Sequence, residues 1–274
     1  MPQDELLIRR SNGDLLAWNV SLGSTGFQYL LNMNGATTLL ATDDFDNRAA
    51  GDEVLFEANG GGALFNPRTG TFAAVPIFAG LPSARGDFQD GPSADIAVMN
   101  DARDLVTYSY ATGSFVYQFR LEPDYSVAGG ADMDGDGRDE VILRRTNGAV
   151  LAYEPLTGQF IDLITLDPMG PVRTVAAANF TGSQAHDVIF YNQDTGAVTL
   201  WDVSRGADGF VPLLTLETGW MMAALDGDFD GDGYNDLVFL NSTGRTVLFG
   251  TSAGFSDITS VISGNVIVGI GDVF

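Results

Sequence analysis

GDFDGDGYNDLVFL, residues 227–240, places four aspartates within nine residues and then continues directly into an apolar stretch typical of a β-strand. The four acids are Asp228, Asp230, Asp232 and Asp236. Coulomb repulsion between carboxylates a few ångströms apart costs on the order of 1 kcal/mol per pair even in water. The pattern therefore predicts that a cation binds between these acids.

The same pattern recurs along the chain. DMDGDGRDEVIL begins at Asp132, and weaker copies begin at Asp44, Asp87 and Asn179. In each of the five copies the first residue and a later acid are eight positions apart, and successive copies start 43 to 49 residues apart. A period of this length indicates a solenoid, a propeller or an array of repeats. A sixth copy is divided between the C-terminal GDVF and the N-terminus, where Asp4 precedes an apolar run.

Each period contains four short apolar runs separated by turns. The later acid is followed by a run such as EVILRR, a turn such as TNG, a second run such as AVLAYEP, another turn and a third run such as FIDLITL. The fourth run is rich in small residues and leads into the next acidic loop, as in VAGGAD. Runs of this composition between Gly, Asn, Asp and Ser are typical of strands in hairpins. The sequence thus predicts four strands per repeat.

Six repeats of four antiparallel strands predict an all-β fold, a six-bladed β-propeller that forms one domain over residues 1–274. The small-residue run is expected to be the innermost strand, where blades converge. The C-terminal run NVIVGIGD is expected to join the blade whose other three strands come from residues 4–31, so that the chain closes on itself. Closure leaves no open sheet edge, which would favour aggregation. The alternative is a β-sandwich whose hairpins are similar by coincidence.

The acidic loops have the residue types and spacing of a calcium site. In Asp-x-Asp-x-Asp-Gly-x-x-Asp, side chains at positions 1, 3, 5 and 9 and the carbonyl at position 7 can converge on one ion. Ca²⁺ takes six to eight oxygens at about 2.3–2.6 Å in flexible loops, whereas Mg²⁺ retains its waters. We expect two calcium sites, made by Asp132, Asp134, Asp136, the carbonyl of Arg138 and Glu140, and by Asp228, Asp230, Asp232, the carbonyl of Tyr234 and Asp236.

The other acidic loops depart from this pattern. The loop from Asp44 has acids at Asp46 and Asp52, but Arg48 stands at position 5, where its cation could replace the metal, so occupancy of this third site stays open. The two remaining loops have too few carboxylates and are expected to form turns held by Asx-type hydrogen bonds. In the two full loops the ion is expected to stabilise the fold rather than to contact a ligand.

Composition limits the possible partners. The 274 residues are 45% hydrophobic, and 13 basic against 36 acidic residues give a formal net charge of −23. This balance argues against nucleic acid or an anionic membrane as partner, because both are bound through clustered Lys and Arg. The absence of cysteine excludes disulfides, a thiolate zinc site and a cysteine nucleophile. No apolar run approaches 18 residues, so no membrane insertion is expected.

The motifs DMDGDGRDEVIL and GDFDGDGYNDLVFL, with the second strands TNGAVLAY and STGRTVLF, resemble the FG-GAP/VCBS repeats of integrin alpha-chain propellers and of many bacterial secreted proteins. The likeness covers essentially the whole chain, strongly in two repeats and by strand pattern in the others. It implies a calcium loop between the innermost and second strands of a blade, and extracellular recognition of glycans or proteins. Integrin propellers have seven blades, so an integrin partner surface is not carried over.

Aromatic residues also follow the repeat, 13 or 14 positions after the later acid, which is typical of packing between blades. They are Trp18, Phe65, Tyr108, Tyr153, Trp201 and Phe249. Trp220 has no aromatic counterpart in the other repeats, and it is expected at the start of an innermost strand, near the mouth of the channel. With Tyr125, Asp124 and Asp167 it forms the candidate ligand site. A plug or a hydrophobic cap in the channel is the alternative.

No catalytic residue is expected. His186 is the only histidine, and nothing in the sequence marks a serine and an acid around it. The many carboxylates include none whose surroundings single it out as a general acid or base. We therefore expect an extracellular or periplasmic, calcium-stabilised recognition module that binds glycans. A protein-binding or adhesion module is the alternative, followed by an enzyme acting on polysaccharide or phosphate esters.

Overall fold

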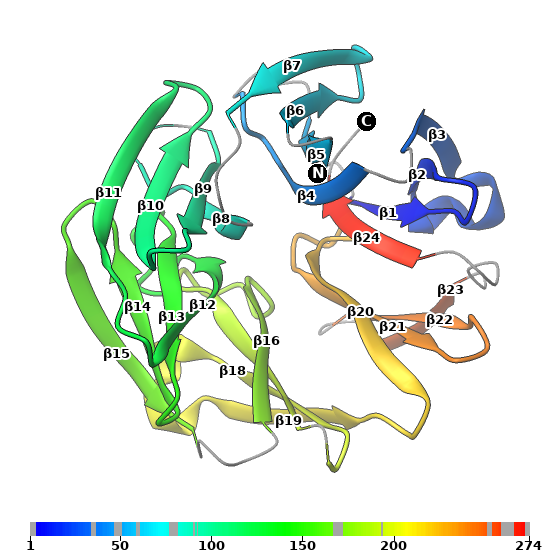
Figure 1. Cartoon of the computed structure of the whole chain (residues 1–274). Coiled ribbons are helices and arrows are strands. Elements are labelled where there is room, and N and C mark those ends of the chain that lie inside the picture. Colours follow the sequence, from blue (N-terminus) through cyan, green and yellow to red (C-terminus); the bar gives the residue numbers. More distant parts are fainter. Residues whose placement is uncertain are drawn as a thin grey trace. The chain divides into compact units, whose positions relative to one another are not determined.

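The computed structural model describes residues 4–33, 37–46, 51–58, 61–76, 82–89, 91, 93–166, 172–192, 194–250, 254–258 and 266–271. Within these residues the chain forms strands β1 to β24 and two short 3₁₀ helices, η1 (Val20–Thr25) and η2 (Val203–Asp208). The strands make six four-stranded antiparallel sheets (Figure 1). Among the residues just named, no helix has the length and apolar character needed to cross a membrane.

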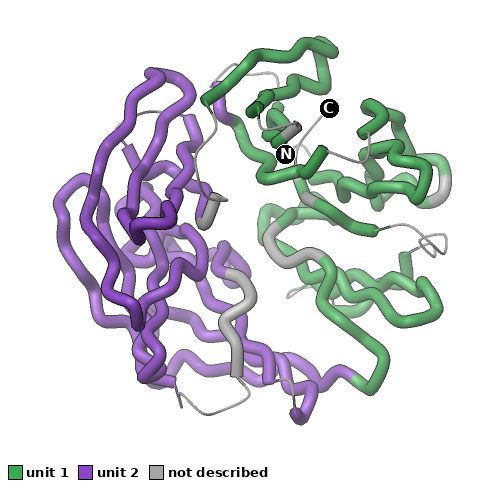
Figure 2. The backbone as a smooth tube through the Cα atoms, viewed as in Figure 1, with its two compact units in different colours: residues 1–44, 48–77, 217–274 green, residues 45–47, 78–216 purple. Residues whose placement is uncertain are grey.

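The chain divides into two compact units, residues 1–44, 48–77 and 217–274, and residues 45–47 and 78–216 (Figure 2). The sheets of the first unit are β24 (Val266–Gly271), β1 (Glu5–Arg9), β2 (Asp14–Trp18), β3 (Phe27–Asn32); β4 (Thr37–Asp43), β5 (Glu53–Ala58), β6 (Gly61–Asn66), β7 (Thr71–Val75); and β20 (Trp220–Gly227), β21 (Asp236–Asn241), β22 (Thr246–Gly250), β23 (Gly254–Ile258). The sheets of the second are β8 (Pro82–Gly86), β9 (Asp95–Met99), β10 (Asp104–Ser109), β11 (Ser114–Arg120); β12 (Tyr125–Ala131), β13 (Glu140–Arg145), β14 (Ala149–Glu154), β15 (Gln159–Thr165); and β16 (Val172–Ala178), β17 (Asp187–Asn192), β18 (Ala197–Trp201), β19 (Phe210–Thr215). The single domain predicted over residues 1–274 stays a prediction.

The second strand of each sheet is the most deeply buried. In β13, Val141, Ile142 and Leu143 are at most 1% exposed, although they follow one another in the sequence. Successive strand residues point to opposite faces of a sheet, so a continuous apolar run requires that both faces be covered. The clusters around Val141 and Ile142 are separate, which shows apolar packing on each face of this sheet. The predicted pattern of four strands per repeat is confirmed.

The first strands of neighbouring sheets lie against one another within each unit, β8 with β12 and β12 with β16 in the second, β20 with β24 and β24 with β4 in the first. This contact explains why these strands carry small residues. A Cβ atom on Gly130 of β12 would lie 2.3 Å from the carbonyl oxygen of Arg85 in β8, which is far inside van der Waals contact. Any side chain at this position would separate the two strands.

The predicted pairing of the C-terminal strand with the N-terminal sheet is confirmed. β24 pairs antiparallel with β1, with Leu6 opposite Ile270 and Leu7 opposite Gly269. On the neighbouring sheet of the same unit, the hydroxyl of Thr42 donates a hydrogen bond to the carbonyl of Ile270. β24 therefore occupies the position that β4, β8, β12, β16 and β20 hold in the other sheets.

The aromatic residues that follow the repeat lie on the third strands, and each stacks on an aromatic residue directly opposite on the fourth strand. The pairs are Trp18–Phe27, Phe65–Phe72, Tyr108–Phe115, Tyr153–Phe160, Trp201–Phe210 and Phe249–Phe255. Ring centroids in these pairs are 4.5 to 5.5 Å apart. Aromatic pairs at such distances contribute about 0.5–1.5 kcal/mol beyond the area that they bury.

Candidate metal centres

Six buried acids begin the second strands of the six sheets. They are Glu5, Glu53, Asp95, Glu140, Asp187 and Asp236, and none is more than 4% exposed. A buried carboxylate is unfavourable unless hydrogen bonds or a cation compensate for lost hydration. The surroundings of these six acids therefore show where a metal ion is needed and where it is not.

Strand register corrects two of the predicted acids by one residue. Asp43 is paired with Glu53, as the residue before each of the other loops is paired with the acid that begins the second strand. The loop from Asp44 is therefore one residue longer than the others, and the predicted ligand Asp52 is replaced by Glu53. In the N-terminal sheet, Glu5 rather than Asp4 begins β1 for the same reason.

In the loop from Asp228, glycines shape the turn around the first acid. The two carboxylate oxygens of Asp228 accept hydrogen bonds from the N–H groups of Gly231 (2.7 Å) and Gly233 (3.0 Å). Gly231 and Gly233 have φ of 82° and 91°, values that strongly favour glycine. The Gly at positions 4 and 6 of the loop thus wraps the backbone around one carboxylate.

The acid at the end of this loop keeps one oxygen without a hydrogen bond. Oδ2 of Asp236 accepts the N–H groups of Phe229 (2.8 Å) and Asp230 (3.2 Å), whereas the buried Oδ1 has no hydrogen-bond partner. Burial, followed by the charge of Asp230, raises the pKa of Asp236 to about 7. Oxygens of Asp228, Asp230 and Asp236 lie within 4.8 Å of one another.

The predicted ligands Asp232 and Tyr234 lie on the exposed side of the same loop. Oδ1 of Asp232 accepts the N–H of Tyr234 at 2.9 Å. Asp232 is not part of the close carboxylate group in the described residues. Its place as a ligand stays a prediction, as does that of the Tyr234 carbonyl.

The loop from Asp132 repeats this geometry. The carboxylate of Asp132 accepts the N–H groups of Gly135 (2.6 Å) and Gly137 (2.9 Å). Oε2 of Glu140 accepts the N–H of Met133 (2.7 Å), and its buried Oε1 has no hydrogen-bond partner. Burial raises the pKa of Glu140.

Two overlapping carboxylate groups occur in this loop. Asp132, Asp134 and Asp136 form one, and Asp136, Glu140 and Glu154 form the other, each with oxygens within 4.8 Å. The predicted ligand Arg138 donates its N–H to Oδ1 of Asp136 at 2.9 Å, so its backbone adjoins the first group. Glu154 was missed because it lies on the third strand, far from the loop in sequence.

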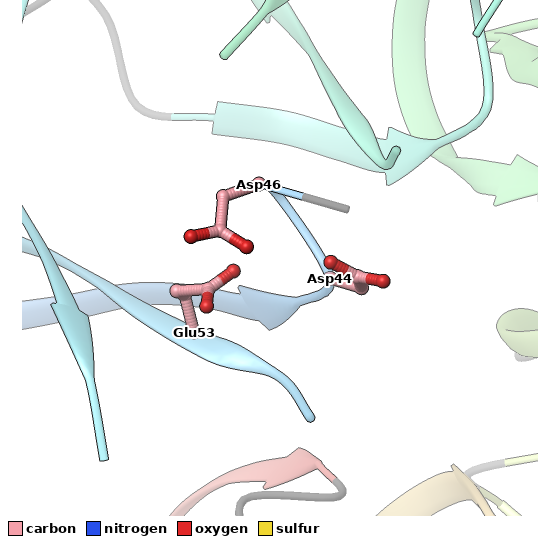
Figure 3. Close-up of side chains that lie close together, drawn as sticks. All are labelled: Asp44, Asp46 and Glu53. Atoms are coloured by element: carbon pink, nitrogen blue, oxygen red, sulfur yellow. The ribbon is translucent and has the colours of Figure 1, made fainter. Parts of the chain in front are cut away.

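The third candidate loop holds Asp44, Asp46 and Glu53 close together, and Figure 3 shows their side chains around one space. Here the acid that begins the second strand has a neutral partner. The Nδ2 amide of Asn66 donates a hydrogen bond of 2.7 Å to Oε1 of Glu53. This loop therefore differs from the two full loops in the surroundings of its buried acid.

The two weak loops keep the same turn without the same acids, as predicted. Oδ2 of Asp95 accepts the N–H groups of Phe88 (3.1 Å) and Gln89 (2.6 Å). In the loop from Asn179, the Asn179 side chain accepts the N–H of Gly182 at 2.7 Å. Backbone donors therefore hold these turns, although burial still raises the pKa of Asp95 to about 6.

Neighbouring loops of one unit are joined by a reciprocal pair of hydrogen bonds, which we call the loop clasp. The N–H of Asp4 donates to the carbonyl of Asp228 (3.0 Å), and the N–H of Asp228 donates to Oδ2 of Asp4 (2.7 Å). Asp139 and Asp87 make the same pair at 3.1 and 2.9 Å. The residue before the buried acid thus connects one sheet to the next.

His186 makes the third clasp. Its N–H donates to the carbonyl of Asp132 (2.6 Å), and its ring Nδ1 accepts the N–H of Asp132 (3.1 Å). The lone pair that a general base would use is therefore engaged in holding two loops together.

The predicted ligand site is not an open aromatic platform. The guanidinium of Arg245 lies 5.6 Å from the ring centroid of Trp220, and that of Arg145 lies 4.8 Å from the centroid of Tyr125. Arg145 also forms an ion pair with Asp124 at 2.7 Å. One face of each ring is thus occupied by a cation. The fourth predicted residue, Asp167, lies outside the described residues.

A cavity of about 400 Å³ opens beside the weak loop of the second unit. Its lining combines hydroxyl, amide and carboxylate groups with apolar side chains. Among the lining residues are Gln89, Ser93, Asp95, Ser114, Val116 and Leu156. Sequence patterns gave no sign of it, because the lining comes from turns of two sheets.

Comparison with known proteins identifies the fold. A chain in the crystal structure of a nidogen/laminin complex is similar at a TM-score of 0.66 and 10% sequence identity, and the match covers 97% of both chains. Together with the six four-stranded sheets and the pairing of β24 with β1, this likeness defines a six-bladed β-propeller. No family model and no curated protein matches the chain.

Proposed function

We propose that this chain is a calcium-stabilised recognition module without catalytic activity, which acts outside the cell or in the periplasm and binds a protein partner. Two buried oxygens carry the metal part of the proposal: Oε1 of Glu140 and Oδ1 of Asp236, neither of which has a hydrogen-bond partner. Buried polar atoms in native proteins nearly always have one. A cation beside each would compensate both and would also neutralise the neighbouring aspartates.

Calcium suits these donors. The carboxylate oxygens of both loops, together with the predicted carbonyls, are hard ligands, which favour Ca²⁺, Mg²⁺ or Mn²⁺ over softer ions. A loop with glycine turns favours Ca²⁺ among these, since Mg²⁺ demands near-octahedral geometry and keeps its waters. The resemblance to FG-GAP/VCBS repeats supports the same ion. Sites in extracellular modules bind calcium with Kd of about 10⁻⁴–10⁻³ M, which calcium outside cells would fill.

A surface of the second unit supports the recognition part. We call it the outer aromatic patch: Phe115, Val116 and Tyr117 of β11, with Leu156 and Phe160 of the neighbouring sheet, each 41–61% exposed. Phe119 of β11 contacts Phe160 of β15 at 5.4 Å, which joins the two strands seen at the left of Figure 1. Exposed apolar groups of this kind mark interaction sites, and aromatic residues are enriched in protein interfaces.

The metal part is tested by thermal unfolding with calcium and with a chelator. Removal of calcium should lower the melting temperature, because the buried carboxylates then repel one another. The double variant Asp134→Ala, Asp230→Ala should show a lower melting temperature in calcium and a smaller response to chelator. A melting temperature that chelator leaves unchanged in the unaltered protein would contradict the calcium part.

The recognition part is tested with a displayed library of random peptides. Peptides selected on the calcium-loaded protein should lose binding to the variant Phe115→Ser, Tyr117→Ser. Phe72→Ser is the matched control, because Phe72 is 60% exposed on the outer strand of another sheet and occupies the position of Phe115. Equal binding to all three proteins would show that the outer aromatic patch is not the binding surface.

Glycan binding is the second candidate, favoured by the cavity of about 400 Å³. Pockets of about 300–1,000 Å³ with few polar groups on mostly apolar walls commonly hold small molecules. The hydroxyl and amide groups of Ser93, Ser114 and Gln89 suit the hydroxyls of a sugar. A glycan array with the unaltered protein and Ser114→Trp, which fills the cavity, separates this function from peptide binding at the neighbouring patch.

A further inference from the structure

One position on the third strand of each sheet lies beside the buried acid of that sheet. It directly follows the aromatic residue of the repeat. The six residues are Asn19, Asn66, Ser109, Glu154, Asp202 and Gly250. We call this position the gatekeeper position, since it differs between sheets in charge and in hydrogen-bonding groups.

Where the gatekeeper is asparagine, its amide donates to the buried acid. Nδ2 of Asn66 lies 2.7 Å from Oε1 of Glu53, and Nδ2 of Asn19 lies 3.4 Å from Oε1 of Glu5. An N–H group provides the positive electrostatic potential that a cation would otherwise supply to a carboxylate. The amide therefore competes with a metal ion for the same oxygen.

Glu154 has the opposite character. It is 8% exposed and its carboxylate lies in one group with Asp136 and Glu140, all within 4.8 Å. One oxygen, Oε1, accepts the N–H of Leu156 at 2.9 Å, which fixes the side chain in place. The adjacent Oε1 of Glu140 is buried and has no hydrogen-bond partner. Two buried carboxylates side by side repel strongly unless a cation lies between them.

Gly250 represents the third case. It is paired with Asp236 in the sheet and provides no side chain near it. Oδ1 of Asp236 is therefore left to the loop itself, whose close carboxylates are Asp228 and Asp230. Compared with the site at Glu140, this site lacks one carboxylate.

We propose that the gatekeeper residue sets the metal occupancy of each acidic loop, and that Glu154 is an additional calcium ligand of the loop from Asp132. The loop from Asp228 binds the same ion with one carboxylate fewer and hence more weakly. The loop from Asp44 is weakest, because Asn66 takes the place of the ion at Glu53. Calcium affinity in related loop sites varies with the number of charged ligands. The inference rests on the calcium binding proposed above.

Calorimetric titration of the chelator-stripped protein with Ca²⁺ alone tests this order. We expect two ions per chain with two distinct affinities. Glu154→Gln should weaken the tighter site about tenfold or more, by analogy with the effect of altered partners around a metal, and leave the other unchanged. Glu122→Gln is the control of equal charge change, because the Glu122 side chain is 72% exposed. Equal affinities for Glu154→Gln and Glu122→Gln would overturn the role of Glu154.

Two reciprocal variants make the test independent of how well Glu154→Gln folds. Gly250→Glu should tighten the weaker site, and Asn66→Asp should add a third ion. Terbium luminescence gives a second count of sites, because Tb³⁺ replaces Ca²⁺ on oxygen ligands. No change in affinity or stoichiometry in either variant would overturn the gatekeeper rule. If the unaltered protein bound no Ca²⁺ at all, the proposed calcium function itself would fail, which is a different result.

Discussion

At the residue scale, the loop clasp shows how one side chain links two blades. His186 accepts the N–H of Asp132 through Nδ1, where Asp4 and Asp139 use a carboxylate oxygen. Asn235 stands at the same point of the loop from Asp228. The position thus requires an acceptor rather than a particular residue.

His186→Ala should lower the free energy of unfolding, because the buried end of the Asp132 N–H loses its acceptor. A net hydrogen bond contributes about 0.5–1.5 kcal/mol, and we expect a loss in this range. His186→Asn should restore most of the stability, since its carbonyl oxygen can accept the same hydrogen bond. Urea unfolding followed by circular dichroism measures both. A variant His186→Asn as unstable as His186→Ala would contradict the clasp.

The backbone next to Asp139 is also tightly determined. Gly86 has φ of 152°, and an added Cβ would lie 2.6 Å from Oδ2 of Asp139, the oxygen that accepts the N–H of Asp87. Gly86→Ala should therefore destabilise the protein by about 1–3 kcal/mol through overpacking. Gly91→Ala is the matched control, because a Cβ there would meet nothing within 4 Å. Thermal unfolding that ranks the two variants equally would contradict the close contact.

At the scale of elements, the acids that begin the second strands make stability depend on pH. Burial raises the pKa of Asp95 to about 6 and that of Asp236 to about 7, whereas an unfolded Asp has a pKa of about 3.9. In the metal-free chain the folded state therefore holds protons that the unfolded state releases. Stability from these groups is present below about pH 4 and declines as pH rises towards 6 and 7.

We therefore expect the chelated protein to melt at a higher temperature at pH 5 than at pH 8. Calcium should oppose this trend, because the ion binds the ionised form of Asp236. Asp236→Asn should flatten the pH dependence of the chelated protein, and Asp95→Asn should flatten its lower part. Melting temperatures at pH 5, 6, 7 and 8 with chelator and with calcium provide the measurement. A chelated protein that gains stability up to pH 8 would show that these acids are ionised when folded.

The strand pattern, the repeat and the pairing of the C-terminal strand could be predicted from sequence, because apolar runs and turn residues are local signals. The exact acid could not always be assigned. Counting eight positions gave Asp52, whereas an extra loop residue places Glu53 in register with the other buried acids. Glu154 carries no local signal at all, since its proximity to Glu140 arises only when β13 pairs with β14. Side-chain partners across strands depend on register, which a repeat count does not fix.

The surroundings of the candidate ligand residues were equally beyond the sequence. Trp220 stood out because no other repeat has an aromatic residue there. The structure adds Arg245 over its ring and Asp257 beside Arg245 at 2.6 Å. An ion pair between neighbouring strands is invisible until both strands have been placed.

At the scale of the whole molecule, the six-bladed propeller depends on β24. It pairs with β1 in one sheet and contacts β4 and β20 of the neighbouring sheets in the same unit. A chain that ends at residue 265 would leave the backbone groups of β1 unpaired, and open edges of this kind pair with other chains. We expect this truncated chain to form oligomers or to aggregate, as measured by size-exclusion chromatography with light scattering.

A circular permutant provides the control for that prediction. Joining residue 274 to residue 1 and opening the chain in the turn after Tyr110 retains β24 and supplies it as an ordinary first strand. This protein should remain monomeric. A monomeric, fully folded truncation would show instead that β24 is dispensable.

The pairing of β24 with β1 also has a consequence for biosynthesis. β1 is among the first strands to leave the ribosome, whereas its partner is synthesised last. The N-terminal hairpin must therefore wait, with one flank unpaired, until translation is complete. A nascent chain in this state needs a chaperone or a delay in compaction, and the same delay would keep it threadable for transport across a membrane.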